Sequence, residues 1–211
     1  MANATTYFLM SGHTSTGRLK PIDRKALEST DNRNVLVLNL TSEDRKKLKS
    51  KQEFFKGYFD ELGAKGVAFI EEETSRDKVE EEFERAGLVY LPGGDAKTLI
   101  RNIQDKKLSP KLYCFNGVIS GNSAGAYALC PNYIRIGHGP TEIIPATGTL
   151  EFHIKVHYKP EFDEELLRLS RDRRTREIIA LEDESAFVWG SKIELIGNIW
   201  RFCDGKKEGN N

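Results

Sequence analysis

The sequence has little cysteine, no excess of charge of either sign and no long hydrophobic run. It contains 211 residues, and its 32 basic side chains are balanced by 32 acidic ones. Because a nucleic-acid-binding protein carries a clear basic excess, we expect no nucleic-acid partner. A membrane-spanning helix needs about 20 consecutive apolar residues. No run of that kind occurs, so we expect no membrane partner.

The few cysteines exclude two further classes of protein. Cys114, Cys130 and Cys203 are widely and irregularly spaced, which fits neither a disulfide framework nor a zinc site. We therefore expect reduced thiols, no bound metal and no cofactor. The first residues lack the positive charge and the apolar core of a signal peptide, which predicts a cytoplasmic protein.

Short β-prone runs alternate with amphipathic helical stretches over the first two thirds of the chain. The patterns predict strands at 7–10, 35–40, 67–70, 88–91 and 117–120, and helices at 43–62, 76–86, 96–106 and 124–130. Such alternation is typical of an α/β fold, with a mostly parallel sheet between two layers of helices.

The pattern changes after Pro131. Further β-prone runs follow at 141–146, 151–156, 185–189 and 194–199, and we expect them to add antiparallel strands to the sheet. No repeat and no linker divides the chain. We therefore expect a single α/β domain over residues 1–205, followed by a disordered tail over residues 206–211.

A candidate nucleophile lies between an expected strand and an expected helix. Gly121, Ser123 and Gly125 form the pattern Gly-x-Ser-x-Gly. A serine on such a sharp turn has a strained backbone, and small residues on both sides avoid a clash. Its hydroxyl lies beside a helix N-terminus, which favours developing negative charge. The alternative is a tight turn or a phosphate-binding loop, although no lysine follows as in a P-loop.

The general base must come from the histidines His13, His138, His153 and His157. The order serine, acid, histidine of an α/β-hydrolase fits poorly, because no histidine lies beyond His157. The order serine, histidine, acid fits better, since many carboxylates follow His157. His153 and His157 bracket an alternating run, so in a strand both would point to the same face. Either can be the catalytic residue, with the other structural.

An oxyanion hole needs two backbone N–H donors near the serine. The amide of Ala124, directly after Ser123, is one candidate. The turn Leu91–Asp95 (Leu-Pro-Gly-Gly-Asp) is placed to supply the other, because glycines let a backbone approach the substrate closely. The alternative is an ordinary turn between a strand and a helix, with Asp95 as the N-cap.

Together these residues resemble the peptidase E family, which includes aspartyl dipeptidases and, more distantly, cyanophycinases. The resemblance extends from about Tyr7 to Phe202. Its most specific parts are the Ser-Ala-Gly-Ala element at 123–126 with the Cys-Pro pair at 130–131, and the turn at 91–95. It implies a glutamine-amidotransferase-like α/β fold in which serine replaces the usual cysteine nucleophile.

The resemblance also implies a role for each candidate residue. Ser123 would be the nucleophile, His157 the general base, and the amides of Gly94 and Ala124 the oxyanion donors. The family's acid falls in the segment 180–188, where Asp183 takes the acid position. Glu182 and Glu184 remain alternatives, because a one-residue shift of the alignment exchanges them. Some relatives use an Asp fifteen residues after the serine, but His138 stands there in this chain, so that role is not carried over.

Substrate recognition departs from the family pattern. Aspartyl dipeptidases hold the substrate aspartate with an arginine in the stretch after the histidine. In this chain that stretch contains Lys159 and then four acidic residues, namely Glu161, Asp163, Glu164 and Glu165. We therefore expect little preference for an N-terminal aspartate and better turnover of neutral or basic short peptides. Gly93, Asn122 and Lys159 are the candidate substrate-binding residues.

The sequence thus predicts a serine peptidase that acts on short peptides through an acyl-enzyme, as a monomer or a homodimer. One alternative is an esterase or amidase that uses the same site on small molecules. A second is a non-catalytic, ligand-binding member of the fold. This last alternative is favoured only if His157 lies out of hydrogen-bond reach of Ser123.

Overall fold

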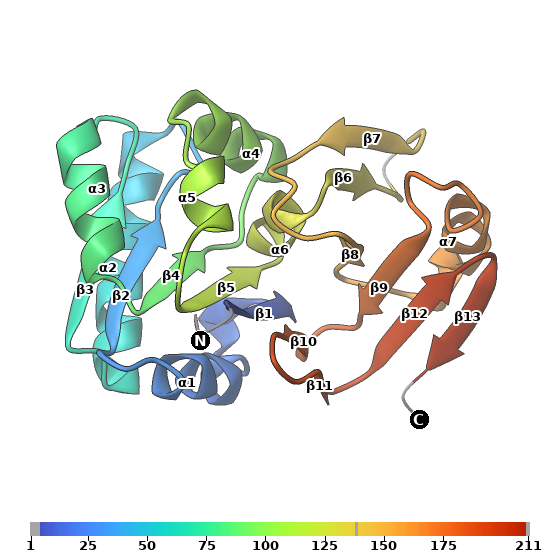
Figure 1. Cartoon of the computed structure of the whole chain (residues 1–211), viewed down its shortest axis with the longest axis horizontal. Helices are drawn as coiled ribbons and strands as arrows, with labels where there is room; N and C mark the ends of the chain where they lie inside the picture. The colour runs from blue at the N-terminus through green and yellow to red at the C-terminus, as the bar shows by residue number, and fades with distance from the viewer. Residues whose placement is uncertain (1–4, 138, 210–211) are drawn as a thin grey trace.

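A seven-stranded sheet forms the centre of the computed structural model, which describes residues 5–137 and 139–209 (Figure 1). The strand order is β11-β10-β1-β5-β4-β2-β3. The parallel strands are β1 (Thr6–Ser11), β2 (Asn34–Leu38), β3 (Gly66–Ile70), β4 (Leu88–Leu91) and β5 (Val118–Asn122). β10 (Ser185–Trp189) and β11 (Glu194–Ile196) extend the sheet in antiparallel pairing. The predicted α/β class, with a mostly parallel sheet and antiparallel additions, is confirmed.

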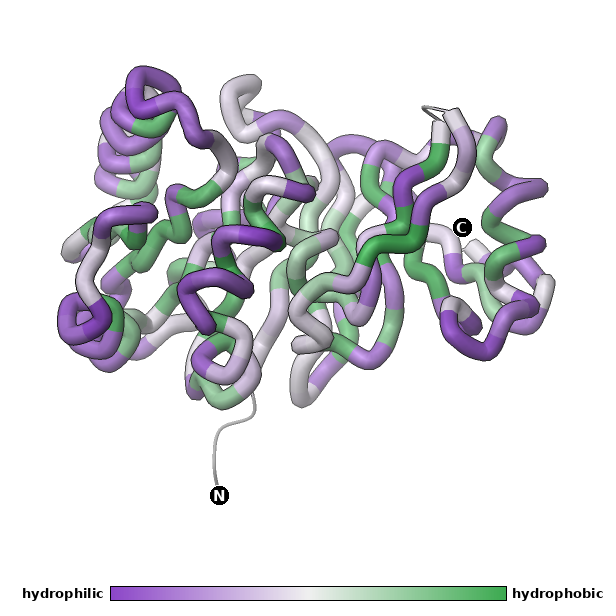
Figure 2. Tube along the Cα trace, turned by 90° about the horizontal axis from the view of Figure 1, so that it is seen from above, coloured by the Kyte–Doolittle hydropathy of each residue, from purple (hydrophilic) through white to green (hydrophobic). Residues whose placement is uncertain are grey.

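Helices cover both faces of this sheet. The helices are α1 (Lys20–Glu28), α2 (Arg45–Leu62), α3 (Arg76–Arg85), α4 (Ala96–Asp105), α5 (Ser109–Tyr113) and α6 (Ala124–Leu129). Val35 and Val37 of β2 pack in one hydrophobic cluster with α1 and α2, whereas Leu36 and Leu38 pack in another with α3 to α6. Because successive side chains of a strand point to opposite faces, each strand contributes hydrophobic residues to the core on both sides of the sheet. Figure 2 shows hydrophilic and hydrophobic positions alternating along the outer helices.

The last third of the chain forms a second structural layer beside the central sheet (Figure 1). A four-stranded sheet has the order β13-β12-β9-β8, from β8 (His153–Lys155), β9 (Glu177–Leu181), β12 (Ile199–Cys203) and β13 (Lys206–Gly209). β6 (Asn132–Arg135) and β7 (Glu142–Pro145) form a separate hairpin, and α7 (Asp163–Leu169) packs on β12. Two short 3₁₀ segments, η1 (Thr14–Thr16) and η2 (Pro160–Phe162), complete the elements.

Two expectations for this region are wrong. The runs near 141–146 and 151–156 do not join the central sheet, and β8 pairs with β9 in parallel. Leu166, Ile178 and Phe202, from α7, β9 and β12, form a hydrophobic cluster of their own, whereas Ile154 of β8 packs in the cluster of the central sheet. A separate cluster allows a separate sheet, because each strand already has a buried face.

The expected disordered tail is also wrong for residues 206–209. These residues form β13, and Phe202 of β12 pairs in register with Lys207. The Lys207 ammonium lies 2.7 Å from a carboxylate oxygen of Asp163 and 4.2 Å from the centroid of the Trp200 ring. These contacts stabilise a strand whose polar composition resembles that of a frayed end. Residues 210 and 211 of that prediction lie outside the described residues.

The parallel strands place their carboxyl ends at one edge of the sheet, where ligands bind in open α/β sheets. The segments after β1, β4 and β5 therefore lie close together. Among the helices of residues 5–137 and 139–209, none combines the length and apolar character needed to cross a membrane.

Candidate active site

Ser123 lies on a strained turn at the carboxyl end of β5. Its φ is 50° and its ψ is −104°, and α6 begins at the next residue. A Cβ atom added to Gly121 would lie 2.8 Å from the amide nitrogen of Ala126, and one added to Gly125 would lie 2.0 Å from the carbonyl oxygen of Leu91. Both positions therefore require glycine for steric reasons, as the Gly-x-Ser-x-Gly pattern predicted.

The imidazole of His157 connects the Ser123 hydroxyl to a carboxylate. Its Nε2 lies 3.0 Å from Ser123 Oγ, and its Nδ1 lies 2.5 Å from Asp183 Oδ1. His157 follows β8 and Asp183 follows β9, two parallel neighbours in the second sheet. Ser123 comes from the central sheet, so the three side chains meet between the two sheets.

The acids that flank Asp183 have other partners. Glu182 accepts hydrogen bonds from the side chains of Asn198 (2.9 Å) and Trp200 (3.3 Å). Glu184 has a positive φ of 69° and forms an ion pair with Arg18. In the described part of the chain, only Asp183 of these three carboxylates contacts His157.

The two histidines expected on one face have different neighbours. His153 lies within β8 and is buried, with its Nε2 3.4 Å from the side-chain nitrogen of Asn132. β8 ends at Lys155, and His157 has a positive φ of 52°, so the strand alternation does not continue to His157. Burial lowers the pKa of His153. The candidate base His138 lies outside the described residues.

Ser11, at the end of β1, was not singled out from the sequence. Its buried hydroxyl accepts a hydrogen bond from the His157 amide (2.8 Å) and donates one to Asp183 Oδ1 (3.2 Å). Its position in the sequence could have indicated a role in the site, because Ser11 ends a parallel strand at the same edge of the sheet as Ser123. Ser11 thereby links the backbone of His157 to the side chain of Asp183.

The turn after β4 adjoins Ser123. A Cβ atom added to Gly93 would lie 3.6 Å from Ser123 Cβ, and Gly94 has a positive φ of 149°. The Lys51 ammonium donates a hydrogen bond to the Gly93 carbonyl oxygen at 2.9 Å. Because the C=O and N–H of a trans peptide point in opposite directions, this contact directs the Gly94 amide away from Lys51. Asp95 caps α4 by accepting a hydrogen bond from the Thr98 amide at 2.7 Å, which is the N-cap role that the sequence predicted for it.

The amides of Gly94 and Ala124 remain available. Within residues 5–137 and 139–209, neither donates a hydrogen bond to a protein acceptor. Ala124 is the first residue of α6, whose leading N–H groups have no partner within the helix. Both amides therefore have the free donor that an oxyanion site requires.

Comparison of the sequence with models of known protein families identifies the family of this chain. The sequence matches the model of peptidase family S51 over residues 7–196. The chain belongs to peptidase family S51. The resemblance to peptidase E proteins is thereby confirmed, and family membership makes the chain a hydrolase of the peptidase type. No curated protein sequence matches the chain.

Solved structures of peptidases share the fold of this S51 peptidase. A peptidase from an acI-B1 actinobacterium has a TM-score of 0.77 at 15% identity, covering 99% of this chain and 94% of its own. A putative peptidase E protein from Listeria monocytogenes EGD-e has a TM-score of 0.64 at 16% identity, covering 92% of this chain and 97% of its own. At such identities the likeness shows the fold alone.

Two cavities of the S51 peptidase flank Ser123. One, of about 430 Å³, is lined by Lys51, Phe54, Gly93 and Asn122 among others. The Asn122 side chain is buried and donates to Thr14 Oγ1 at 2.9 Å, while its Oδ1 has no partner in the described residues.

The second cavity, of about 560 Å³, contains a buried cation that sequence analysis missed. Lys155 is only 6% exposed, and its ammonium lies 3.5 Å from the Tyr127 hydroxyl and 4.4 Å from the centroid of the Phe162 ring. Among the described residues, no carboxylate forms an ion pair with it, and burial lowers its pKa to about 8. Ser123, His157 and the exposed Lys159 line the same cavity.

Two of the four acidic residues after His157 are paired with cations in the fold. Asp163 pairs with Lys207 at 2.7 Å, and Glu165 pairs with Arg168 at 2.6 Å. Glu161 lines the cavity of Lys155. The repulsion expected from Asp163 and Glu165 is therefore reduced, because paired charges cancel at a distance.

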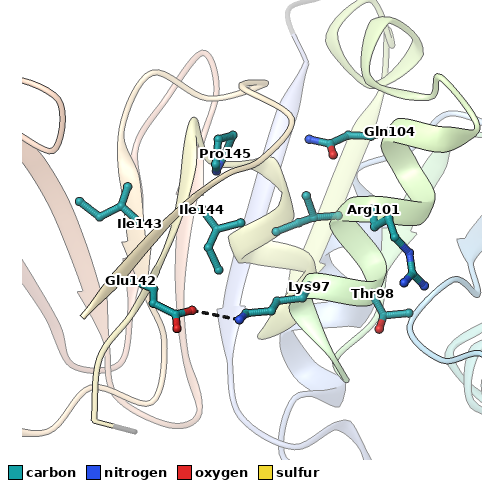
Figure 3. A pocket seen from close by; sticks show the side chains of 9 residues that line it. Lys97, Thr98, Arg101, Gln104, Glu142, Ile143, Ile144 and Pro145 are labelled. Atoms are coloured by element: carbon teal, nitrogen blue, oxygen red, sulfur yellow. Dashed lines mark hydrogen bonds and ion pairs between the residues drawn. The ribbon is translucent and has the colours of Figure 1, made fainter. Parts of the chain in front are cut away.

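A further cavity of the S51 peptidase lies away from Ser123. It has a volume of about 580 Å³ and lies between α4 and β7. Figure 3 shows Lys97 and Glu142 joined across it by an ion pair, whose atoms are 2.9 Å apart. Neither Ser123 nor His157 lines this cavity, so it is not the candidate site.

Proposed function

We propose that this S51 peptidase is a serine peptidase that hydrolyses short peptides. The observation that carries the proposal is the continuous chain from Ser123 Oγ to His157 Nε2 (3.0 Å) and from His157 Nδ1 to Asp183 Oδ1 (2.5 Å). This arrangement is the one that activates a serine hydroxyl in unrelated hydrolases. It does not meet the condition that would favour a non-catalytic member of the fold, namely a His157 out of reach of Ser123.

The reaction proceeds by acyl transfer. Ser123 Oγ attacks the peptide carbonyl carbon while His157 Nε2 accepts the hydroxyl proton. Asp183 stabilises the resulting imidazolium through Nδ1. The tetrahedral intermediate collapses when His157 returns the proton to the leaving amine, and water then hydrolyses the acyl-enzyme by the same steps. The amides of Gly94 and Ala124 stabilise the negative oxygen of both tetrahedral intermediates.

Active-site titration tests this proposal. A fluorophosphonate probe is expected to label the wild type and not Ser123→Ala, because it reacts with an activated serine. Parallel assays with peptides and with small esters separate a peptidase from the esterase or amidase alternative. Failure to label either protein would contradict both enzymatic readings of the site.

The cavity of Lys155 supports a proposal for the substrate. A buried ammonium without a carboxylate partner is costly, and a substrate carboxylate would compensate it. We propose that this cavity takes an acidic side chain or the terminal carboxylate of a short peptide. The proposal departs from the expectation drawn from the sequence, since that expectation considered only the residues after His157.

Lys155→Met is expected to lower kcat/KM for peptides with an acidic group at least about tenfold, or roughly 1.4 kcal/mol. The matched amide peptides, with Asn in place of Asp, are expected to change much less, because they lose no ion pair. Lys65→Met provides the control, since Lys65 is an exposed lysine that does not line this cavity. Equal effects on the acidic and amide peptides would contradict this substrate assignment.

The same side chain makes the preference depend on pH. Lys155 is protonated below its pKa of about 8 and neutral above it. The ratio of kcat/KM for acidic over amide peptides is therefore expected to fall about tenfold per pH unit above 8, because kcat/KM reports the free enzyme. A ratio that stays constant from pH 7 to pH 10 would count against Lys155.

Lys51→Met is expected to lower kcat about tenfold or more with little change in KM, because an oxyanion donor acts in the transition state. The variant leaves the Gly93–Gly94 peptide without the ammonium that orients it. Lys51→Arg is expected to recover part of kcat, and Lys49→Met on the exposed side of α2 serves as the control. A change confined to KM would show that Lys51 contacts substrate and does not orient the turn.

A further inference from the structure

His13 lies beside the catalytic imidazole with a free ring of its own. The residue is exposed and follows β1, and its ring stacks on that of His157 with centroids 5.6 Å apart and planes inclined by 29°. In the part of the chain that the structure describes, no protein group forms a hydrogen bond with either ring nitrogen of His13. The proposed serine mechanism has no use for this imidazole.

The surroundings of His13 offer the donor atoms of a metal site. One donor atom each of His13, His157 and Asp183 lie within 4.8 Å of one another. Two imidazole nitrogens and one carboxylate oxygen are typical zinc ligands, with a water molecule in the fourth position. Bond lengths of about 2.0–2.2 Å require donors roughly 3.3 Å apart, so the cluster must contract modestly.

The exposed His13 side chain is the ligand with the most room to move for that contraction. The His13 side chain is exposed, and its backbone is extended (φ −108°, ψ 112°) ahead of η1. His157 and Asp183 already lie in contact at 2.5 Å, so a metal ion would separate them slightly as His13 moves inward. The neighbouring cation Arg18 is paired with Glu184, which leaves the Asp183 carboxylate available to an ion.

We propose that His13, His157 and Asp183 bind one divalent transition-metal ion, with Zn²⁺ as the best match, and that this ion inhibits the peptidase reversibly. A His157 nitrogen that binds a metal cannot serve the proton relay. Coordination through Nε2 removes the acceptor of the Ser123 proton, whereas coordination through Nδ1 breaks the contact with Asp183 and leaves the ring proton on Nε2, so that Nε2 cannot accept the Ser123 proton. The inhibition rests on the proposed function, but binding of the ion does not.

Direct titration of an inactive protein tests the binding. The protein is Ser123→Ala, which keeps all three ligands, combined with Cys114→Ser, which removes an exposed thiol that could bind zinc. Calorimetry with Zn²⁺ and visible absorption with Co²⁺ are expected to show one ion per chain. Adding His13→Asn is expected to weaken Zn²⁺ binding at least tenfold. Absence of saturable binding, or equal affinity with and without His13, would overturn the proposal.

A kinetic measurement separates this inference from the proposed function. Wild-type activity is expected to fall with added Zn²⁺ and to return with a chelator, and His13→Asn is expected to need at least tenfold more Zn²⁺ for half-inhibition. If the chain shows no serine-dependent turnover, the proposed function fails, and the titration still decides the metal site. An active enzyme with the same zinc sensitivity in both proteins would overturn the metal site alone.

Discussion

Ser123→Ala is expected to reduce peptide turnover by about 10³-fold or more, because nucleophile, base and acid act as one unit. The fold is expected to remain intact. Ser123 has a strained backbone with a φ of 50°, and among the described residues its hydroxyl forms a hydrogen bond only with the half-buried His157 ring. Removing a functional group from a strained site costs little stability and can add some. Steady-state kinetics with a short peptide and thermal unfolding measure the two effects.

Ser120→Ala is the matched control for this prediction. Ser120 lies in β5, the strand that ends just before Ser123; it is fully buried, and its hydroxyl has no hydrogen-bond partner in the described residues. Its removal is expected to leave activity and stability nearly unchanged, because an unpaired buried hydroxyl contributes nothing to lose. More than a tenth of wild-type activity in Ser123→Ala would exclude Ser123 as the nucleophile.

His157→Ala is expected to match the loss of Ser123→Ala, and the double variant to lose no more than either single one. His153→Ala is expected to keep most activity, since its ring contacts Asn132 and not the Ser123 hydroxyl. Because His153 is 3% exposed, truncating it leaves a cavity, so stability falls by roughly 1–3 kcal/mol. Kinetics below the unfolding temperature of each variant separate the two histidines.

The contrast between these histidines makes the prediction easy to refute. Small and equal effects of His153→Ala and His157→Ala would mean that neither is the base. His138→Ala would then be the next variant to measure. A large loss of activity in His153→Ala without a matching loss of stability would reverse the assignment.

Local sequence patterns determined the fold class and the position of the candidate nucleophile. The strand and helix periods alternate over the first two thirds of the chain, and each pattern needs only a few consecutive residues. The Ser123 turn is equally local. A side chain at Gly121 would clash with the backbone of Gly125 and Ala126, just beyond the turn, and one at Gly125 would clash with Leu91 on the neighbouring strand. Short-range chemistry also sets the helix ends: Asp95 begins α4 as its N-cap, and Gly63 ends α2 as its C-cap.

The choice of partners for Ser123 depended on pairing between distant strands. Alternation along 153–157 could not separate His153 from His157, because the positive φ of His157 arises where β8 ends. Asp183 is selected over its neighbours because β9 and β10 belong to different sheets, and β10 pairs with β1 in a register that sets Ser185 opposite Ser11.

Only the tertiary structure revealed the surroundings of the site. Lys155 reads as an ordinary charged residue in the sequence, yet the second sheet buries it in a cavity shared with Ser123. The acids after His157 read as a repelling cluster, yet Lys207 and Arg168 neutralise two of them. The physical reason is that burial and charge pairing depend on which surfaces meet, and residues distant in the chain supply those surfaces. Sequence patterns therefore determined the local geometry at Ser123, and the packing of two sheets decided its electrostatic environment.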